Sequence, residues 1–298
     1  MSRPSPLAFF KQSLKSDSYH ADELINIYLL RPLAAALVWL VYPTRLIPNH
    51  ITLLAIFAGL CAAGFYAAGS SVAVAIGGLL MTTKDILDDA DGQLARAKKM
   101  YSRRGRFLDS IGDFVVDLSV FTAITYTVYQ TTDEAAAIVL GVLGFLGITL
   151  RVSYHVFYQV SFLHREERGK LNRITEEITA EDREGDKIAL RLQQVFLLIY
   201  GWQDRMMVRL DQWCKRKQFD EEMDDRWYSD KVGLRLSGLM GFGTELALLT
   251  ACSLANALNL YLVLNVSLMN GIWAANIAYR RIGLARKKKV RSAPSSPG

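Results

Sequence analysis

Residues 88–113 read DDADGQLARAKKMYSRRGRFLDSIGD, and this stretch decides how the chain folds. Asp88 and Asp91 are three residues apart, so they share one face of a helix. Asp109 and Asp113 are four residues apart and share a face of the next helix. The residues between the two pairs form a short basic connection, and the residues outside them are largely apolar. We therefore expect two apolar helices that bring four carboxylates together beside a basic loop.

Small residues and one arginine stand between the two acid pairs. Gly92 and Ala95 leave space for a ligand close to the helix backbone, and Arg96 offers a planar fork of donors for phosphate oxygens. Carboxylates close to a membrane are costly unless a charge compensates them. A divalent cation held by oxygen ligands is such a charge. The stretch therefore predicts a site for a cation and a phosphate-bearing ligand.

The remainder of the chain is rich in apolar runs. Of its 298 residues, 51% are hydrophobic, and the formal net charge is +6. A helix needs roughly 20 apolar residues to cross a bilayer core. Six runs approach that length, at 51–68, 71–87, 107–130, 135–161, 236–254 and 257–279. We expect an all-α integral membrane protein with six transmembrane helices and both termini on one side.

Lysine and arginine are distributed unevenly among the connections. They are frequent in the loop at 96–106, in residues 163–235 and in the tail at 280–291, and they are missing from the connections at 69–70, 131–134 and 253–256. Because short basic connections stay in the cytoplasm, the acid motif is predicted at the cytoplasmic ends of the second and third spans, where soluble nucleotides are available. The expected location is a bacterial cell membrane.

The apolar run from Ile25 to Leu46 differs from the six spans. Arg31 and Pro32 interrupt it, and the part that follows is short for a span. We expect an amphipathic helix in the membrane interface, with a seventh span as the alternative.

Residues 163–235 also differ from their surroundings. A densely charged first part is followed at 188–213 by apolar and basic residues that alternate with helical period. Two interpretations stay open, an amphipathic helix on the cytoplasmic surface with Trp202 and Trp213 at headgroup level, or a solvated insertion packed on the protein. The expected organisation is a cytoplasmic N-terminus and interfacial helix (1–47), four spans with the motif (48–162), a charged and amphipathic cytoplasmic insertion (163–235), two spans (236–282) and a basic disordered tail (283–298).

The acid stretch resembles the signature of a known family. The order D-x-x-D-G-x-x-A-R, eight residues, G-x-x-x-D-x-x-x-D is complete, at Asp88, Asp91, Gly92, Ala95, Arg96, Gly105, Asp109 and Asp113. This order is similar to that of the CDP-alcohol phosphotransferases, also called CDP-alcohol phosphatidyltransferases. Eight specified positions at the correct spacing make a specific motif. The resemblance implies a metal-dependent transferase of phospholipid biosynthesis whose members commonly form homodimers.

The resemblance also implies roles for individual residues. Asp88, Asp91 and Asp109 would bind two divalent cations, Mg²⁺ or Mn²⁺, and Asp113 would be the base that deprotonates the acceptor while also contacting a metal. The residues alone do not separate ligand from base among the four acids. The CDP group would be bound by Asp88, Asp91, Gly92, Ala95, Arg96 and Gly105, together with Pro48, Asn49 and Thr52, which match a family P-N-x-x-T sequence.

Charged residues deeper in the spans are candidates for the acceptor site. Arg151 and His155 are four residues apart on one helix face, and Lys84 lies one turn before the first motif acid. Together they could receive a phosphate or carboxylate of the acceptor. The alternative for Arg151 is a structural ion pair with Glu245.

Three functions remain open at this stage. The first is transfer of a phosphatidyl group from a CDP-linked lipid, such as CDP-diacylglycerol, to an alcohol acceptor with release of CMP. The second is the transfer of a head group from CDP-choline or CDP-ethanolamine to a lipid alcohol. The third is an ion-coupled transporter, which intramembrane acids alone would permit. Membrane lipids are the expected surroundings, and no nucleic-acid partner is expected.

Overall fold

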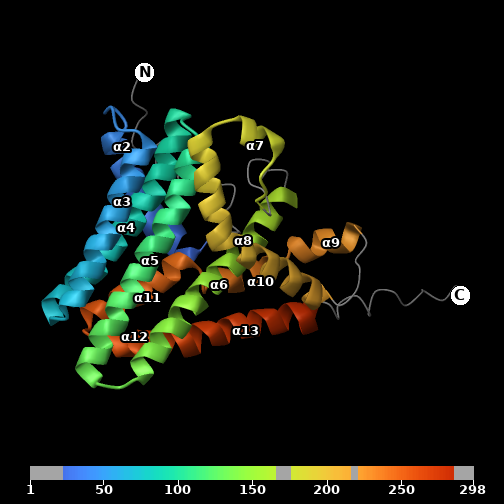
Figure 1. Cartoon of the computed structure of the whole chain (residues 1–298). Coiled ribbons are helices and arrows are strands. Elements are labelled where there is room, and N and C mark those ends of the chain that lie inside the picture. The colour runs from blue at the N-terminus through green and yellow to red at the C-terminus, as the bar shows by residue number, and fades with distance from the viewer. Residues whose placement is uncertain (1–22, 166–175, 216–220, 285–298) are drawn as a thin grey trace, which may run out of the picture.

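The computed structural model describes residues 23–165, 176–215 and 221–284 (Figure 1). Every regular element in these ranges is helical, which confirms the expected all-α class. In chain order the elements are η1 (Asn26–Leu30), α2 (Arg31–Val41), α3 (Pro48–Ala68), α4 (Ser71–Lys98), α5 (Arg103–Thr132), α6 (Ala136–Arg165), α7 (Ala180–Glu184), α8 (Lys187–Lys215), α9 (Glu221–Tyr228), α10 (Lys231–Gly238), α11 (Phe242–Leu254), α12 (Leu258–Leu264), η2 (Asn265–Met269), α13 (Asn270–Ala278) and η3 (Tyr279–Leu284). The three η elements are single π-helical stretches. The tail from residue 285 onward lies outside the described residues, so its expected disorder stays a prediction.

Four stretches of the described residues are long and apolar enough to cross a membrane. They are Pro48–Ala68, Ala136–His164, Met223–Leu254 and Leu258–Leu284. With 28 and 30 residues, α4 and α5 also have the length of a span, but they carry the charges of the acid motif. The chain is thus an all-α integral membrane protein, and the number of six spans stays a prediction.

The two C-terminal spans are less regular than the sequence suggests. The fifth expected span, 236–254, contains the end of α10, a break at 239–241 and then α11, which has 13 residues. Gly241 caps the start of α11 with an extended backbone, and this conformation ends the continuous helix. The sixth expected span, 257–279, contains α12, η2 and α13 in succession.

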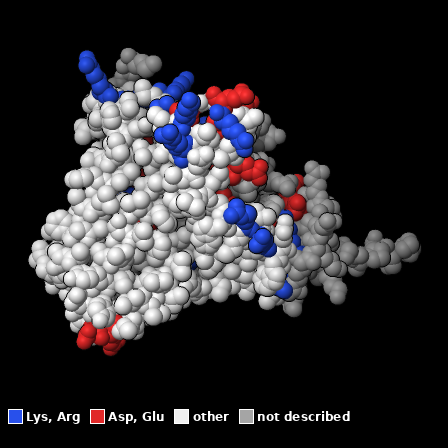
Figure 2. Space-filling model, in the orientation of Figure 1, with Lys and Arg blue, Asp and Glu red and all other residues white. Residues whose placement is uncertain are grey.

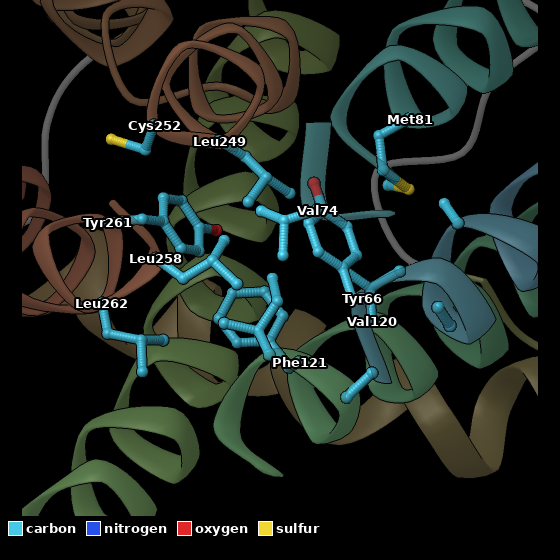
Figure 3. Packing of buried hydrophobic residues seen from close by; sticks show 14 of the residues in the cluster. Tyr66, Val74, Met81, Val120, Phe121, Leu249, Cys252, Leu258, Tyr261 and Leu262 are labelled. Carbon is cyan, nitrogen blue, oxygen red and sulfur yellow. The ribbon is translucent and has the colours of Figure 1, made fainter. Parts of the chain in front are cut away.

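The main apolar core lies among α3, α4, α5, α6, α11 and α12. Figure 3 shows Tyr66 and Val74 in the middle of this cluster, with Phe121, Leu249 and Tyr261 around them. The tyrosine hydroxyl is buried and lies 2.8 Å from Ser253 Oγ, so its polar atom has a partner inside the core. This core packs the apolar parts of these six helices against one another.

α3 and α5 interlock at two glycines. A Cβ atom on Gly59 of α3 would overlap the side chain of Val116 in α5, and a Cβ atom on Gly112 of α5 would overlap Ile56 in α3. Small residues at such positions let two helix backbones approach closely. The N-terminal half of α5 is therefore held directly against α3.

Serine caps fix the two motif helices at their starts. Ser70 Oγ accepts from Ala73 N at 3.3 Å at the start of α4, and Ser102 Oγ accepts from Gly105 N at 3.2 Å at the start of α5. α4 ends at Lys98, and the next residue, Lys99, has a left-handed φ of 56°. Only residues 99–102 join the two helices, so α5 runs back along α4 and the motif acids of both helices face one another.

The short N-terminal helix packs on the motif helices. Ala34, Ala35 and Val38 of α2 are fully buried in a cluster with Leu87 and Leu94 of α4. The helical part, Asn26–Val41, is shorter than a span. Its expected position in the membrane interface stays a prediction.

The insertion at 163–235 forms α7, α8 and α9 and is packed on the protein. Phe196 of α8 lies against Phe107 of α5, with ring centroids 5.4 Å apart, and Tyr200 donates to Ser110 O at 2.8 Å. The opposite face of α8 is open, because Leu198 is 79% exposed. One face of α8 is thus packed on the protein, while Trp202 and Trp213 are 41% and 53% exposed, and the choice between the two interpretations of the insertion stays a prediction.

Charge is segregated over the surface. Figure 2 shows Lys and Arg gathered at the top and right, over the junction of α4 and α5 and over the insertion. The lower left of the same view, where the helices of the main core lie, is almost free of charge apart from an acidic patch at its lower edge, beside the turn between α5 and α6. This distribution agrees with the uneven placement of basic residues in the sequence.

Candidate active site

Three motif acids converge at the junction of α4 and α5. One carboxylate oxygen each of Asp88, Asp91 and Asp109 lies within 4.8 Å of the others. All three side chains are partly buried, so their negative charges are only partly screened by water. Hard divalent cations take oxygen ligands of this kind, and such a cation would compensate the charge. The donor set therefore fits a divalent cation.

The fourth motif acid is held separately. Asp113 forms an ion pair with Lys84 of α4; the lysine side chain is fully buried, and the Asp113 side chain is 27% exposed. Lys84 also lies 3.8 Å from Asp88 and 4.8 Å from the ring centroid of Phe242 in α11. Asp113 is thus paired with a buried positive charge that also lies near Asp88 of the cation group.

A cavity of about 610 Å³ opens beside the cation group. It is lined by Pro48, Asn49 and Thr52 of α3, by Asp91, Gly92 and Ala95 of α4, by Met100, Tyr101 and Ser102, by Arg103, Gly105, Arg106 and Asp109 of α5, and by Glu176. Seven of the nine residues expected to bind CDP belong to this lining, since only Asp88 and Arg96 are not among them. The three helices α3, α4 and α5, the connection between α4 and α5 and the segment before α7 therefore enclose one space next to the acids.

Residues of α3 line the cavity and also contact motif residues of α4 and α5. Thr52 donates a hydrogen bond to Asp91, which fixes one carboxylate of the cation group. At the start of the helix, Asn49 lies so close to Gly105 that any side chain at Gly105 would overlap its amide oxygen. The glycine of the motif is thus explained by a close approach between α3 and α5.

Gly92 and Arg96 occupy neighbouring turns of α4. Gly92 lines the cavity, and the atom nearest to an added Cβ would be Arg96 Nη1 at 3.4 Å. Arg96 itself is exposed and is not among the lining residues. Its role in phosphate binding stays a prediction.

Several lining residues were not identified from the sequence. Arg103 and Arg106 could be read there only as part of a basic loop, and Glu176 as one acid within a densely charged stretch. In the structure Arg106 Nη2 lies 2.8 Å from Glu176 Oε2, and Arg103 Nη2 lies 3.5 Å from Glu176 Oε1. The spacing of Arg106 and Asp109 on one helix face was the available signal, because it puts an arginine one turn from a motif acid.

Two of the residues expected at the acceptor site lie away from the cavity. Arg151 forms an ion pair of 2.9 Å with Glu245, and neither side chain is exposed. His155 Nδ1 lies 2.9 Å from Ser237 Oγ and is also buried. The structure thus contains the ion pair that was the alternative for Arg151, and of the three acceptor candidates it brings only Lys84 to the motif acids.

Comparison with known proteins gives matches over the same region. The family model described as CDP-alcohol phosphatidyltransferase matches residues 45–213, which include the acid motif, the residues that line the cavity and most of α8. The Bifunctional IPC transferase and DIPP synthase of Archaeoglobus fulgidus is 37% identical over 89 residues, which are 30% of this chain and 17% of that protein. Proteins of the same name from Thermococcus kodakarensis and Aquifex aeolicus are 32% identical over 110 residues and 34% identical over 77 residues, covering 37% and 26% of this chain. The matches span between 17% and 24% of the length of these relatives.

Proposed function

Because the chain belongs to the CDP-alcohol phosphatidyltransferase family, we propose that it transfers a phosphatidyl group from a CDP-linked lipid, such as CDP-diacylglycerol, to an alcohol acceptor and releases CMP. The observation that carries this proposal is the convergence of Asp88, Asp91 and Asp109 beside a cavity of about 610 Å³. The three relatives named above carry the word transferase in their names, which supports a group-transfer reaction.

The donor site follows from the needs of a diphosphate ester. The family depends on divalent cations, and here Asp88, Asp91 and Asp109 would hold two of them, Mg²⁺ or Mn²⁺. When bound, the cations neutralise the diphosphate and stabilise the departing CMP. Gly92 and Ala95 provide the wall against which the nucleotide lies, since neither has a side chain that would fill the cavity.

Asp113 is the proposed base. A hydroxyl is a weak nucleophile at neutral pH, so a positioned carboxylate that accepts its proton lowers the barrier. Asp113 lies one helical turn from Asp109, which lines the cavity, and its side chain keeps an exposed fraction of 27%. Lys84 holds this carboxylate in place through the ion pair.

The membrane setting supports the same assignment. The basic residues around the junction of α4 and α5 favour a cytoplasmic position for the cavity, where the released CMP would enter the cytoplasm. A lipid donor would reach the acids from the bilayer that surrounds the apolar helices. Assembly as a homodimer and a bacterial cell membrane are parts of the same proposal.

An assay of CMP release in detergent tests the function. The purified chain is expected to release CMP from CDP-diacylglycerol only when Mg²⁺ or Mn²⁺ and a suitable alcohol are both present. A parallel reaction with CDP-choline and diacylglycerol would reveal head-group transfer instead. If neither donor gives CMP with any alcohol in the scan, the proposed activity is wrong.

A matched pair of variants connects the assay to the acids. Asp91→Asn is expected to weaken the response to Mn²⁺ and the binding of CDP together, because one ligand oxygen loses its charge. Asp133→Asn, in the exposed turn between α5 and α6, is the control, since asparagine tolerates the left-handed φ of 55° at that position. An unchanged Mn²⁺ titration in Asp91→Asn would remove this residue from the cation site.

A further inference from the structure

Acidic residues of the insertion form ion pairs with the basic first turn of α5. Arg103, Arg104 and Arg106 occupy the first turn of this helix, and each one pairs with an acid from the segment 176–186. The pairs are Arg103 with Asp182 and Glu176, Arg104 with Asp186, and Arg106 with Glu176. The insertion thus contributes charge at the mouth of the proposed donor site.

The three acids differ in their position relative to the cavity. Asp182 and Asp186 line a separate hollow of about 230 Å³ between α5 and α8, and there they fasten the insertion to the arginines. Glu176 instead lines the large cavity, together with Arg103 and Arg106. Its side chain is 7% exposed, whereas the two arginine side chains are 46% and 39% exposed. The carboxylate therefore lies between the guanidinium groups inside the donor site.

The arginines have the chemistry of an anion site. Guanidinium groups bind phosphate oxygens with directed, charge-assisted hydrogen bonds. Arg106 lies one turn before Asp109 on the same face of α5, so a diphosphate ester held at the cation group has this arginine next to it. Both guanidinium groups also lie over the ring of Phe107, at 5.8 and 4.8 Å from its centroid, which restricts where they can point.

We propose that Glu176 is a specificity-determining residue of the donor site, whose carboxylate occupies the phosphate position formed by Arg103 and Arg106. A phosphate of the incoming donor must displace this carboxylate, so Glu176 lowers the affinity of the site for anions. The inference rests on the proposed function, because it takes the cavity as the place where the CDP group binds. Gln193 Nε2 lies 3.0 Å from Glu176 Oε1 and remains a partner of this side chain when the arginines turn to the ligand.

Binding of CDP to the full-length chain in neutral detergent with Mn²⁺ tests the inference. Glu176→Gln is expected to lower the Kd for CDP by about threefold to tenfold at low salt, the scale of one partly screened charge a few ångströms away. Glu177→Gln is the matched control, since Glu177 is exposed and is not among the lining residues, and its Kd should stay within about twofold of wild type. Cytidine carries no phosphate, so its binding should not change in Glu176→Gln.

A second substitution shows whether the effect passes through the arginines. In an Arg106→Gln background, Glu176→Gln should no longer improve the binding of CDP, because the proposed phosphate position is already lost. Glu176→Asp keeps the charge but shortens the side chain, so it should fall between wild type and Glu176→Gln, and it provides a test if the glutamine variant folds poorly. Weaker binding of CDP in Glu176→Gln, or an equal gain in the Arg106→Gln background, would overturn the inference.

The same titrations distinguish the two levels of the argument. If the wild-type chain does not bind CDP in the presence of Mn²⁺, the proposed function fails. If the wild-type chain binds CDP and Glu176→Gln binds it equally well, the donor site stands and the role of Glu176 is wrong.

Discussion

Two of the fully buried cationic side chains in the described part of the chain, Arg151 and Lys84, have different surroundings. Arg151 of α6 pairs through Nη2 with Glu245 of α11 at 2.9 Å. Its Nη1 donates to Asn270 Oδ1 at 2.6 Å and to Asn265 O at 3.1 Å. Neither member of that pair is exposed to solvent. Lys84 of α4 is equally buried, but its partner Asp113 is 27% exposed.

The difference shows what separates a structural charge from one at a site. A cation buried in a membrane protein is a functional candidate by default, and both of these would qualify. The arginine has its charge matched and most of its donors bonded within the core. The lysine instead faces a group of acids, since Asp85, Asp88 and Asp117 also interact with it electrostatically. An excess of nearby acids and a partner that is partly exposed therefore mark the site, whereas burial alone does not.

The largest effect is expected from a substitution of Asp113, the partly exposed partner of Lys84. Asp113→Asn should lower the rate of CMP release by about 10²–10⁴-fold, because an amide cannot accept the proton of the acceptor hydroxyl. Binding of CDP with Mn²⁺ should be retained, and this measurement is the control for correct folding. Normal turnover in this variant would remove the base assignment and, with it, the contrast between the two pairs.

The next effect is on stability at the closed pair. Glu245→Gln leaves the Arg151 guanidinium buried without a counter-charge, which should cost about 3–5 kcal/mol of unfolding free energy. Denaturant unfolding in detergent measures the loss. Replacing both partners by apolar residues of similar volume should recover most of it, since the desolvated charge is then removed as well. A Glu245→Gln variant as stable as wild type would contradict a structural role for the pair.

Removing the other cation should cost less. Lys84→Met leaves the Asp113 carboxylate partly in contact with water, so the expected loss is at most about 2 kcal/mol, well below that of the closed pair. The variant also adds uncompensated negative charge to the group of acids. Added Mn²⁺ should therefore raise its thermal midpoint more than that of wild type. If Mn²⁺ stabilises both proteins equally, the lysine does not share its surroundings with the cation site.

The smallest effect is expected at the pair of Arg103 and Asp182, in which the arginine side chain is 46% exposed and the aspartate side chain is buried. Hydrogen bonds from Arg103 and from the backbone of Thr179 hold the pKa of Asp182 well below its usual range. A depressed pKa means that the charged form stabilises the fold above about pH 4, and that this contribution is lost as the pH falls further.

The pH dependence of wild type and Asp182→Asn gives the measurement. The difference between their unfolding midpoints in detergent should be constant from about pH 8 to pH 5 and should shrink below about pH 4. The acids at the cation site titrate in both proteins, so they cancel in the difference. A difference that grows on acidification would contradict the assignment of the shift to this pair.

The sequence was sufficient to predict those contacts that depend only on the spacing of residues along a helix and on the length of the loop that follows it. Asp88 and Asp91 follow one helix and Asp109 follows the next, so a short basic connection brought their carboxylates within 4.8 Å of one another as expected. Pro48, Asn49 and Thr52 also line the cavity that the motif predicts. Helical period and loop length determine such contacts, and both can be read from the order of residues.

The sequence was insufficient where a contact depends on how distant segments pack. Glu176 is 70 residues from Arg106, and its neighbours carry so many charges of both signs that no single acid stands out. For Arg151 both a pair with Glu245 and a place at the acceptor site were compatible with the pattern, because helical spacing does not say which face turns to a cavity. The break before α11 falls in a run that was read from its length as one span, although Gly238, Gly241 and Gly243 lie close to the break.

The interlocked glycines of α3 and α5 have a consequence for how substrates exchange. Gly59 and Gly112 each leave space that a bulky side chain of the opposite helix fills. Neither helix can therefore slide along the other without moving these side chains out of that space. The framework that carries the acids is thereby kept rigid during turnover. Any widening of the cavity entrance must therefore come from the ion pairs at its rim. Their partly exposed side chains can exchange one ion-pair partner for another.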